Sequence, residues 1–316
     1  MSVWLPTTIS TERGSKMKTA SWRDNRVFAV ALVSLGFIVI WYLGAIFLNG
    51  QQLVSQYERR HQDWDASKVV AEALSMRRPV LPTPDQVVVE LNQSVFHEAI
   101  TSKRSLVFHT GITLSSTLLG FVLGAALGIL LAIGIVHNRT LESSLMPWII
   151  TSQTIPILAI APMVIVVLGS LNFTGLVPKS LISMYLSFFP VTISMVKGLR
   201  SADRLHMELL HTYSATTRQV LWKLRWPASL PFLFAGLKVA IAASLVGAIV
   251  GELPTGAQGG LGARLLSGSY YGQMVQIWAA LVMAALLGAL LVVLVGMGEK
   301  WVLKRMGTRT ELGAAA

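Results

Sequence analysis

The sequence predicts an all-α membrane protein with about six transmembrane helices and with both termini in the cytoplasm. Of its 316 residues, 53% are hydrophobic and only 13% are charged, and the mean hydropathy is +0.61. The apolar residues form runs of about 20 residues, the length that a helix needs to cross a bilayer core. The basic residues, which give the chain a net charge of +11, lie between these runs. That distribution favours positive cytoplasmic loops over a nucleic-acid-binding surface.

Six runs are interpreted as membrane-spanning helices, because backbone amides inside lipid find hydrogen-bond partners only within a helix. They cover residues 27–48, about 110–136, 145–169, 181–196, 232–251 and 277–297. No signal-peptide cleavage site precedes the first run, so we expect it to stay in the membrane as an anchor. The chain has no cysteine, which excludes disulfides, thiolate metal sites and cysteine nucleophiles.

The connections between the runs indicate the orientation of the chain. Basic residues gather in the N-terminal segment 1–26, in the loop 201–229 and in the tail 301–316. Because such residues remain on the cytoplasmic side, we expect these three segments there. Lys179 and Arg264 are the basic residues expected in the short outer loops.

The long segment 49–109 is expected outside, because its acidic residues balance its basic ones and long segments cross the membrane largely regardless of charge. Helical periodicity around 67–74 predicts an amphipathic helix there. The proline-rich stretch 77–84 follows it and predicts a rigid, extended elbow.

Small residues and prolines mark two of the expected spans. Gly120, Gly124 and Gly128 lie four residues apart and predict a surface where another helix packs closely, with a smooth channel wall as the alternative. Pro156 predicts a kink in the third span and is a candidate for the substrate path, because such a kink can open polar backbone to a water-filled path. Gln153 and Thr154, just before that proline, either line a water-filled path or satisfy the carbonyls that the kink frees.

Two further polar residues are candidates for the substrate path. Ser187 lies within the fourth span, and Glu252 lies near the outer end of the fifth, where an ionisable group is costly. The alternative for Glu252 is that it only marks the start of a loop containing Pro254 and four glycines, Gly256, Gly259, Gly260 and Gly262. Lys238 lies four helical turns earlier, too far to pair with Glu252, and is expected to extend toward the inner interface.

The loop 201–229 is too polar for lipid and too long for a simple turn. Leu205, Leu209 and Tyr213 recur every four residues and predict a helix. A turn at Ser214 and a second short helix follow, which Pro227 is expected to stop. Two helices with exposed apolar and basic side chains are typical of an element that docks into a groove of a partner.

This loop resembles the cytoplasmic loop of the permeases of binding-protein-dependent ABC importers. Their pattern reads Glu-Ala-Ala, three residues, Gly, nine residues, Ile, one residue, Leu-Pro. The matching positions here, together with the residue after the turn, are Glu208, Leu209, Leu210, Ser214, Ala215, Leu224 and Pro227. The spacing agrees throughout, but both alanines are leucines here, the glycine is serine and Trp226 replaces the final leucine.

Further motifs resemble the nitrate, sulfonate and taurine branch of these permeases. They are LPTP at 81–84, PILAIAP at 156–162, SFFPV at 187–191, GLK at 236–238 and GLG at 260–262. The resemblance implies a MetI-like fold in which residues 110–300 form the permease domain of a bacterial inner-membrane protein. It also implies a small solute, either an anion such as a sulfonate, taurine or nitrate, or a vitamin precursor such as a pyrimidine or riboflavin.

The resemblance implies partners as well. A separate ABC ATPase docks on the loop 201–229 and binds the ATP, so this chain is expected to carry no catalytic residue, cofactor or metal. A periplasmic or lipid-anchored solute-binding protein delivers the substrate. A second permease completes the path, as an identical copy or as a sister permease, and alternating access moves the solute.

Three other classes of protein fit the sequence less well. A secondary transporter would place ionisable residues near the bilayer middle and show inverted repeats, and neither is visible in the sequence. An intramembrane enzyme would need a motif such as HExxH, GxSxG, paired carboxylates or a Walker loop, and none is present. A plain structural membrane protein would leave the loop 201–229 unexplained.

Overall fold

The computed structural model describes residues 26–254 and 259–306, and all regular elements in these ranges are helical. Most of the segments 1–26 and 301–316 lie outside the described residues, as does Gly256. The α-helices are α1 (Arg26–Arg59), α2 (Ala66–Ser75), α3 (Pro84–Asn92), α4 (Leu106–His137), α5 (Arg139–Ser152), α6 (Ile157–Ser170), α7 (Leu176–Arg200), α8 (Arg204–Thr212), α9 (Thr217–Val220), α10 (Trp226–Glu252), α11 (Leu261–Tyr270) and α12 (Met274–Arg305). Two π-helical turns, Gln93–His97 and Leu221–Arg225, follow α3 and α9.

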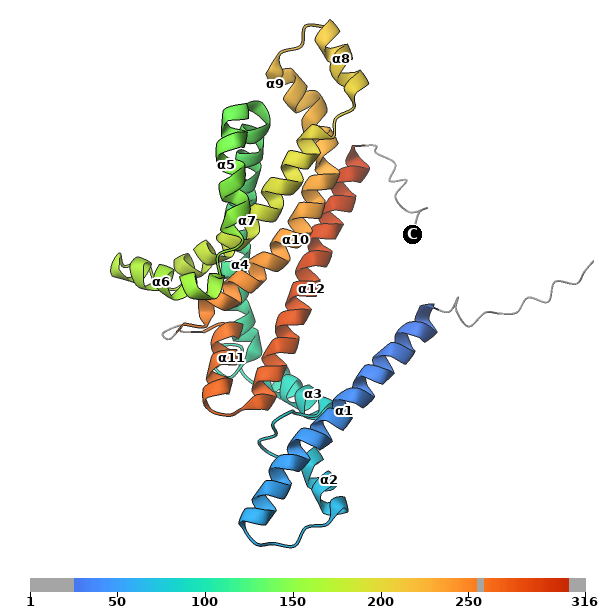
Figure 1. The fold of residues 1–316 in the computed structure, drawn as a ribbon, viewed down its shortest axis with the longest axis vertical. Coiled ribbons are helices and arrows are strands. Elements are labelled where there is room, and N and C mark those ends of the chain that lie inside the picture. The colour runs from blue at the N-terminus through green and yellow to red at the C-terminus, as the bar shows by residue number, and fades with distance from the viewer. Residues whose placement is uncertain (1–25, 255–258, 307–316) are drawn as a thin grey trace, which may run out of the picture.

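Five helices in the described chain are long and apolar enough to cross a membrane, which confirms the all-α membrane class. They are α1, α4, α7, α12 and the continuous helix Thr217–Glu252 that joins α9 to α10. The expected third span, 145–169, is not one helix. It is divided into α5 and α6, which meet at 100°, and α6 projects sideways from the bundle (Figure 1).

The break between α5 and α6 follows from the sequence around Pro156. The prolyl nitrogen cannot donate a helical hydrogen bond, and the residue before a proline avoids the helical conformation. The last turn of α5 tightens before the break, where Gln153 N donates to Ile150 O at 3.2 Å and Thr154 N to Thr151 O at 3.0 Å. The sequence predicted a kink here, and the structure shows a complete change of direction.

Helix α1 and the segment after it form a separate arm beside the bundle (Figure 1). Asn49 is buried and holds the proline-rich elbow, because its Oδ1 accepts from Val80 N at 2.8 Å and its Nδ2 donates to Leu81 O at 2.9 Å. The ring of Trp41 packs on Trp278 of α12 with centroids 4.9 Å apart. The amphipathic helix predicted around 67–74 is α2.

Helices α4, α7 and α10 form the centre of the bundle, with α7 in contact with both others. The glycine row of α4 lies against α7. A Cβ at Gly128 would lie 2.8 Å from the Cβ of Val191, and Cβ atoms at Gly120 and Gly124 would overlap with Ser183 and Ser187. Since lipid supplies little hydrophobic drive between helices, this close packing is what holds the pair together.

We expect Gly124→Ala to destabilise the protein by about 1–3 kcal/mol, because the added methyl would force α4 away from α7. The measurement is thermal unfolding of the detergent-solubilised protein. Gly111→Ala, on the same helix, is the matched control, since a Cβ at Gly111 meets nothing within 4 Å. Equal unfolding temperatures for the two variants would contradict the packing role of the row.

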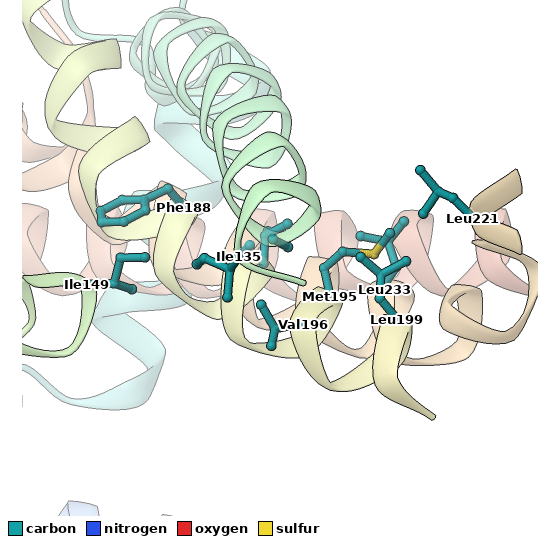
Figure 2. Packing of buried hydrophobic residues seen from close by; sticks show 11 residues of the cluster. Ile135, Ile149, Phe188, Met195, Val196, Leu199, Leu221 and Leu233 are labelled. Atoms are coloured by element: carbon teal, nitrogen blue, oxygen red, sulfur yellow. The ribbon is translucent and has the colours of Figure 1, made fainter. Parts of the chain in front are cut away.

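The largest apolar core lies where α4, α5, α7 and α10 meet (Figure 2). Met195 and Leu199 of α7 pack there with Leu233 of α10, and Leu221 of the π-helical turn joins the end of the cluster. An ion pair of 2.8 Å between Arg200 and Glu142 ties the end of α7 to the start of α5. The segment that carries α8 and α9 is therefore anchored directly on the bundle core.

Candidate functional site

Helices α8 and α9 extend beyond the bundle at the end opposite α11 (Figure 1). Asp203 begins α8 by accepting a hydrogen bond from Leu205 N at 3.0 Å. No residue of α8 is buried, and Leu205, Leu209 and Tyr213 are 72%, 52% and 77% exposed. Apolar side chains spaced along one short helix and left uncovered form a surface that suits a partner groove.

The turn after α8 is built around Ser214, whose φ of 53° is left-handed. Ser214 N donates to His211 O at 2.9 Å, and Ala215 N donates to Leu210 O at 3.0 Å. This pair of hydrogen bonds is the Schellman motif, in which glycine is the usual left-handed residue. The left-handed backbone of this turn therefore explains why the ABC-permease pattern has glycine at this position. Serine adopts the same turn at some conformational cost.

The second helix begins at Thr216, where a capping box forms with Gln219: Thr216 N donates to Gln219 Oε1 at 2.8 Å. The prediction that Pro227 stops this helix is wrong. The π-helical turn Leu221–Arg225 precedes the proline, and Trp226 N donates to Leu221 O, five residues back. The π-helical turn shifts the hydrogen-bond register just before Pro227, so the proline is accommodated and the helix continues to Glu252.

Glu208 lies on the exposed part of α8. Its carboxylate is 3.0 Å from the Nε of Arg204, one turn earlier, and the two side chains are 63% and 92% exposed. A surface pair of this kind contributes little stability. Leu224 and Pro227, at the base of the loop, are partly buried.

The five residues predicted for the substrate path do not converge on one site. Gln153, Thr154 and Pro156 are exposed at the bend between α5 and α6. The hydroxyl of Thr154 donates to Thr151 O at 2.8 Å, which satisfies a carbonyl near the break. Ser187 is fully buried in the contact between α4 and α7, where it donates to Gly120 O at 3.3 Å.

Glu252, the fifth, lies in a buried polar cluster at the other end of the bundle. Its oxygens accept from the Thr113 hydroxyl at 2.9 Å and from Gly262 N at 2.9 Å, and its exposed fraction is 0%. Lys179 Nζ is 3.9 Å from Glu252 Oε1 and donates to Gly259 O at 2.9 Å. We call Glu252, Lys179, Thr113 and His109, with the backbone of 259–262, the Glu252 cluster.

The cluster holds the segment between α10 and α11 in place through hydrogen bonds from the backbone N–H groups of that segment. Leu261 N donates to the Thr113 hydroxyl at 2.8 Å, and Gly260 N donates to His109 Nδ1 at 3.0 Å. His109 therefore carries its proton on Nε2, which donates to Lys103 O at 2.9 Å. Gly260 has a φ of 121°, and a Cβ there would overlap with the Glu252 carboxylate, so this position requires glycine.

The cluster corrects one expectation. Lys179 was placed in a short outer loop, but it lies in the first turns of α7 and is 7% exposed. Lys238 does not pair with Glu252, as expected, and forms an ion pair with Glu299 of α12. The sequence showed that Lys179 and Glu252 have opposite charges near the ends of apolar runs, but spacing alone gave no reason to pair them.

A cavity of about 560 Å³ lies beside the cluster. Its lining comes from α4, α6, the start of α7 and the end of α10, and none of the five predicted path residues is among its described lining residues. Those are Ile112, Ser115, Ile165, Gly169, Phe173, Thr174, Gly175, Leu176, Pro178, Lys179, Gly251, Pro254 and Gly259. The sequence gave no signal for this cavity, because its walls come from distant segments.

Comparison with known proteins places this arrangement among transport proteins. Residues 124–308 match the family described as "Binding-protein-dependent transport system inner membrane component". The chain is 34% identical to a formylaminopyrimidine transport permease protein, ThiX, of Halalkalibacterium halodurans, over 58% of this chain and 68% of that protein.

Two further relatives extend over more of the chain. It is 33% identical to a riboflavin transport system permease protein, RibX, of Chloroflexus aurantiacus, over 70% of this chain and 78% of the relative. It is 30% identical to a putative aliphatic sulfonates transport permease protein, SsuC, of Bacillus subtilis, over 71% of this chain and 78% of the relative.

Proposed function

Because the chain belongs to the family of binding-protein-dependent transport system inner membrane components, we propose that its α8–α9 loop docks on a separate ATPase and that two copies enclose the solute path. The chain is a multi-pass inner-membrane permease of an ABC importer for a small solute. We propose, beyond this family membership, the docking residues, the dimer, the orientation of the chain in the membrane and the solute.

The exposed apolar surface of α8 carries the proposal for the loop. Leu205, Leu209 and Tyr213 stand on a helix that is capped at both ends, so their positions are set before a partner arrives. Such preorganisation lowers the entropy lost on docking. With the ATPase in the cytoplasm, docking there would place this loop and both chain termini on the cytoplasmic side.

The connections of the loop support a mechanical role. Helix α7 ends at Arg200, shortly before α8 begins, and α9 continues without interruption into α10. Since α7 and α10 pack along each other, a displacement of the loop would reach both helices together. Differential contact with two states of the ATPase would then shift the permease between its two access states.

A second copy is proposed to cover part of the exposed apolar surface of α5 and α6. Trp148, Met163 and Val166 are 76%, 67% and 71% exposed in the described chain. The sideways projection of α6 from the bundle and the exposed apolar side chains on both helices support contact with lipid and with another permease (Figure 1). A sister permease in place of the identical copy is the alternative.

Reconstitution in liposomes tests the proposed function. We expect ATP-driven uptake of solute only when the chain is combined with its ATPase and its solute-binding protein. Omitting the ATPase or ATP should abolish uptake. Solute uptake driven by an ion gradient through the chain alone would instead identify a secondary transporter and overturn the proposal.

A further inference from the structure

We propose that the cavity beside the Glu252 cluster is a solute-binding chamber for a small uncharged ring compound, and that pairing of Lys179 with Glu252 keeps it unsuited to anions. This inference rests on the proposed function, because it assigns a solute class to an importer. It concerns residues outside the α8–α9 loop, so it can fail while the coupling to an ATPase stands.

The size and shape of the cavity suit a small organic molecule. Its volume of about 560 Å³ falls in the range of small-molecule sites, roughly 300–1,000 Å³. The wall is formed mainly by apolar side chains, including Ile112, Ile165 and Leu176, with the ring of Phe173 beside them. An aromatic face and aliphatic walls favour a flat, apolar ring over a strongly hydrated group.

Hydroxyl groups in the lining give the chamber its hydrogen-bonding capacity. Ser115 and Thr174 line it and are both exposed. The Ser115 hydroxyl donates to Ile112 O at 2.7 Å and so offers a ligand its acceptor lone pairs, whereas Thr174 adds a second hydroxyl. A hydroxyl can donate and accept, which matches the ring nitrogens and exocyclic groups of a heterocycle. A few convergent polar groups in an apolar wall are the usual composition of a site for a small ligand.

Charge is the feature that separates the two solute classes. Lys179 is the one charged residue among the described residues of the lining, and its ammonium is already paired with Glu252 and hydrogen-bonded to Gly259 O. A sulfonate or nitrate entering the chamber would lose its hydration without an unpaired cation to replace it, which is costly.

Thiol labelling tests the chamber. Because the chain has no cysteine, an introduced cysteine is the only thiol on this subunit. Ser115→Cys and Thr174→Cys are introduced singly, and the whole importer is labelled in liposomes without ATP by a methanethiosulfonate reagent. The probes are 4-aminopyrimidine, lumiflavin and ethanesulfonate. We expect one of the ring compounds to slow labelling about fivefold when it fills about four-fifths of the cavities, and ethanesulfonate to have no effect.

Ser269→Cys on α11 is the matched control, since Ser269 is exposed but does not line the cavity. Its labelling should stay unchanged with every probe. Protection by ethanesulfonate, or no protection by either ring compound, would overturn the inference. ATP-driven uptake by the same liposomes is measured in parallel, so a failed chamber with intact uptake leaves the proposed function standing.

Discussion

Glu252→Leu is expected to cost about 3–5 kcal/mol of stability, because it leaves the buried ammonium of Lys179 without its partner. Leucine is also unable to accept the hydrogen bonds from Gly262 N and the Thr113 hydroxyl, both of which are buried. Unpaired buried donors add to the loss. Thermal unfolding of the purified protein measures it, and we expect poor yield and a strongly lowered unfolding temperature.

Two further variants separate charge from hydrogen bonding. Glu252→Gln retains an oxygen for Thr113 and Gly262 and should lose less stability than Glu252→Leu. The double variant Lys179→Met, Glu252→Leu removes both charges and should recover part of the lost stability, because two buried apolar side chains carry no desolvation cost that a partner must offset.

The ion pair between Lys238 and Glu299 supplies a control for the effect of burial. Lys238 and Glu299 are partly exposed, so Glu299→Gln should cost at most about 1 kcal/mol. If Glu299→Gln lowered the unfolding temperature as much as Glu252→Leu, burial of the Glu252 cluster would not be the source of its importance.

The double variant Leu205→Asp, Leu209→Asp is expected to abolish ATPase docking while leaving the fold intact. The two side chains are 72% and 52% exposed, so their replacement removes little internal packing. Loss of central apolar contacts in an interface costs about 2 kcal/mol or more, and two new carboxylates would also need desolvation. Co-purification with the ATPase and ATP-driven uptake measure the effect.

Val89→Asp is the control for that variant. Val89 of α3 is 64% exposed but lies far from α8, so an aspartate there should alter neither docking nor uptake (Figure 1). The unfolding temperatures of the Leu205→Asp, Leu209→Asp double variant and of Val89→Asp should both match that of the parent protein. Normal uptake by the double variant would show that the ATPase contacts the permease elsewhere.

The helical spans and the loop could be predicted from the sequence because both are local properties. An uncharged run of sufficient length must be a helix in lipid, and the four-residue spacing of Leu205, Leu209 and Tyr213 is a property of one helix. Boundaries were less predictable. Helix α1 continues past residue 48 to Arg59, because a polar sequence outside lipid can extend a helix by packing on α2.

The Glu252 cluster could not be predicted, because it depends on how distant helices align. Thr113 and Glu252 are 139 residues apart in sequence, and their contact requires α4, α7 and α10 to pack in one register. That register is set partly by the glycine row of α4 against α7. The 100° bend after α5 has a similar origin, since Pro156 removes a donor but the surrounding packing decides the new direction.

The uninterrupted helix Thr217–Glu252 has a geometric consequence. Its 36 residues cover about 54 Å at the helical rise, with the α8–α9 loop at one end and the Glu252 carboxylate at the other. A tilt of about 5° around the midpoint would shift each tip by roughly 2 Å. That displacement exceeds the tolerance of a hydrogen bond. A small movement of the α8–α9 loop, driven by the ATPase, would therefore break the hydrogen bonds of the Glu252 cluster at the other end.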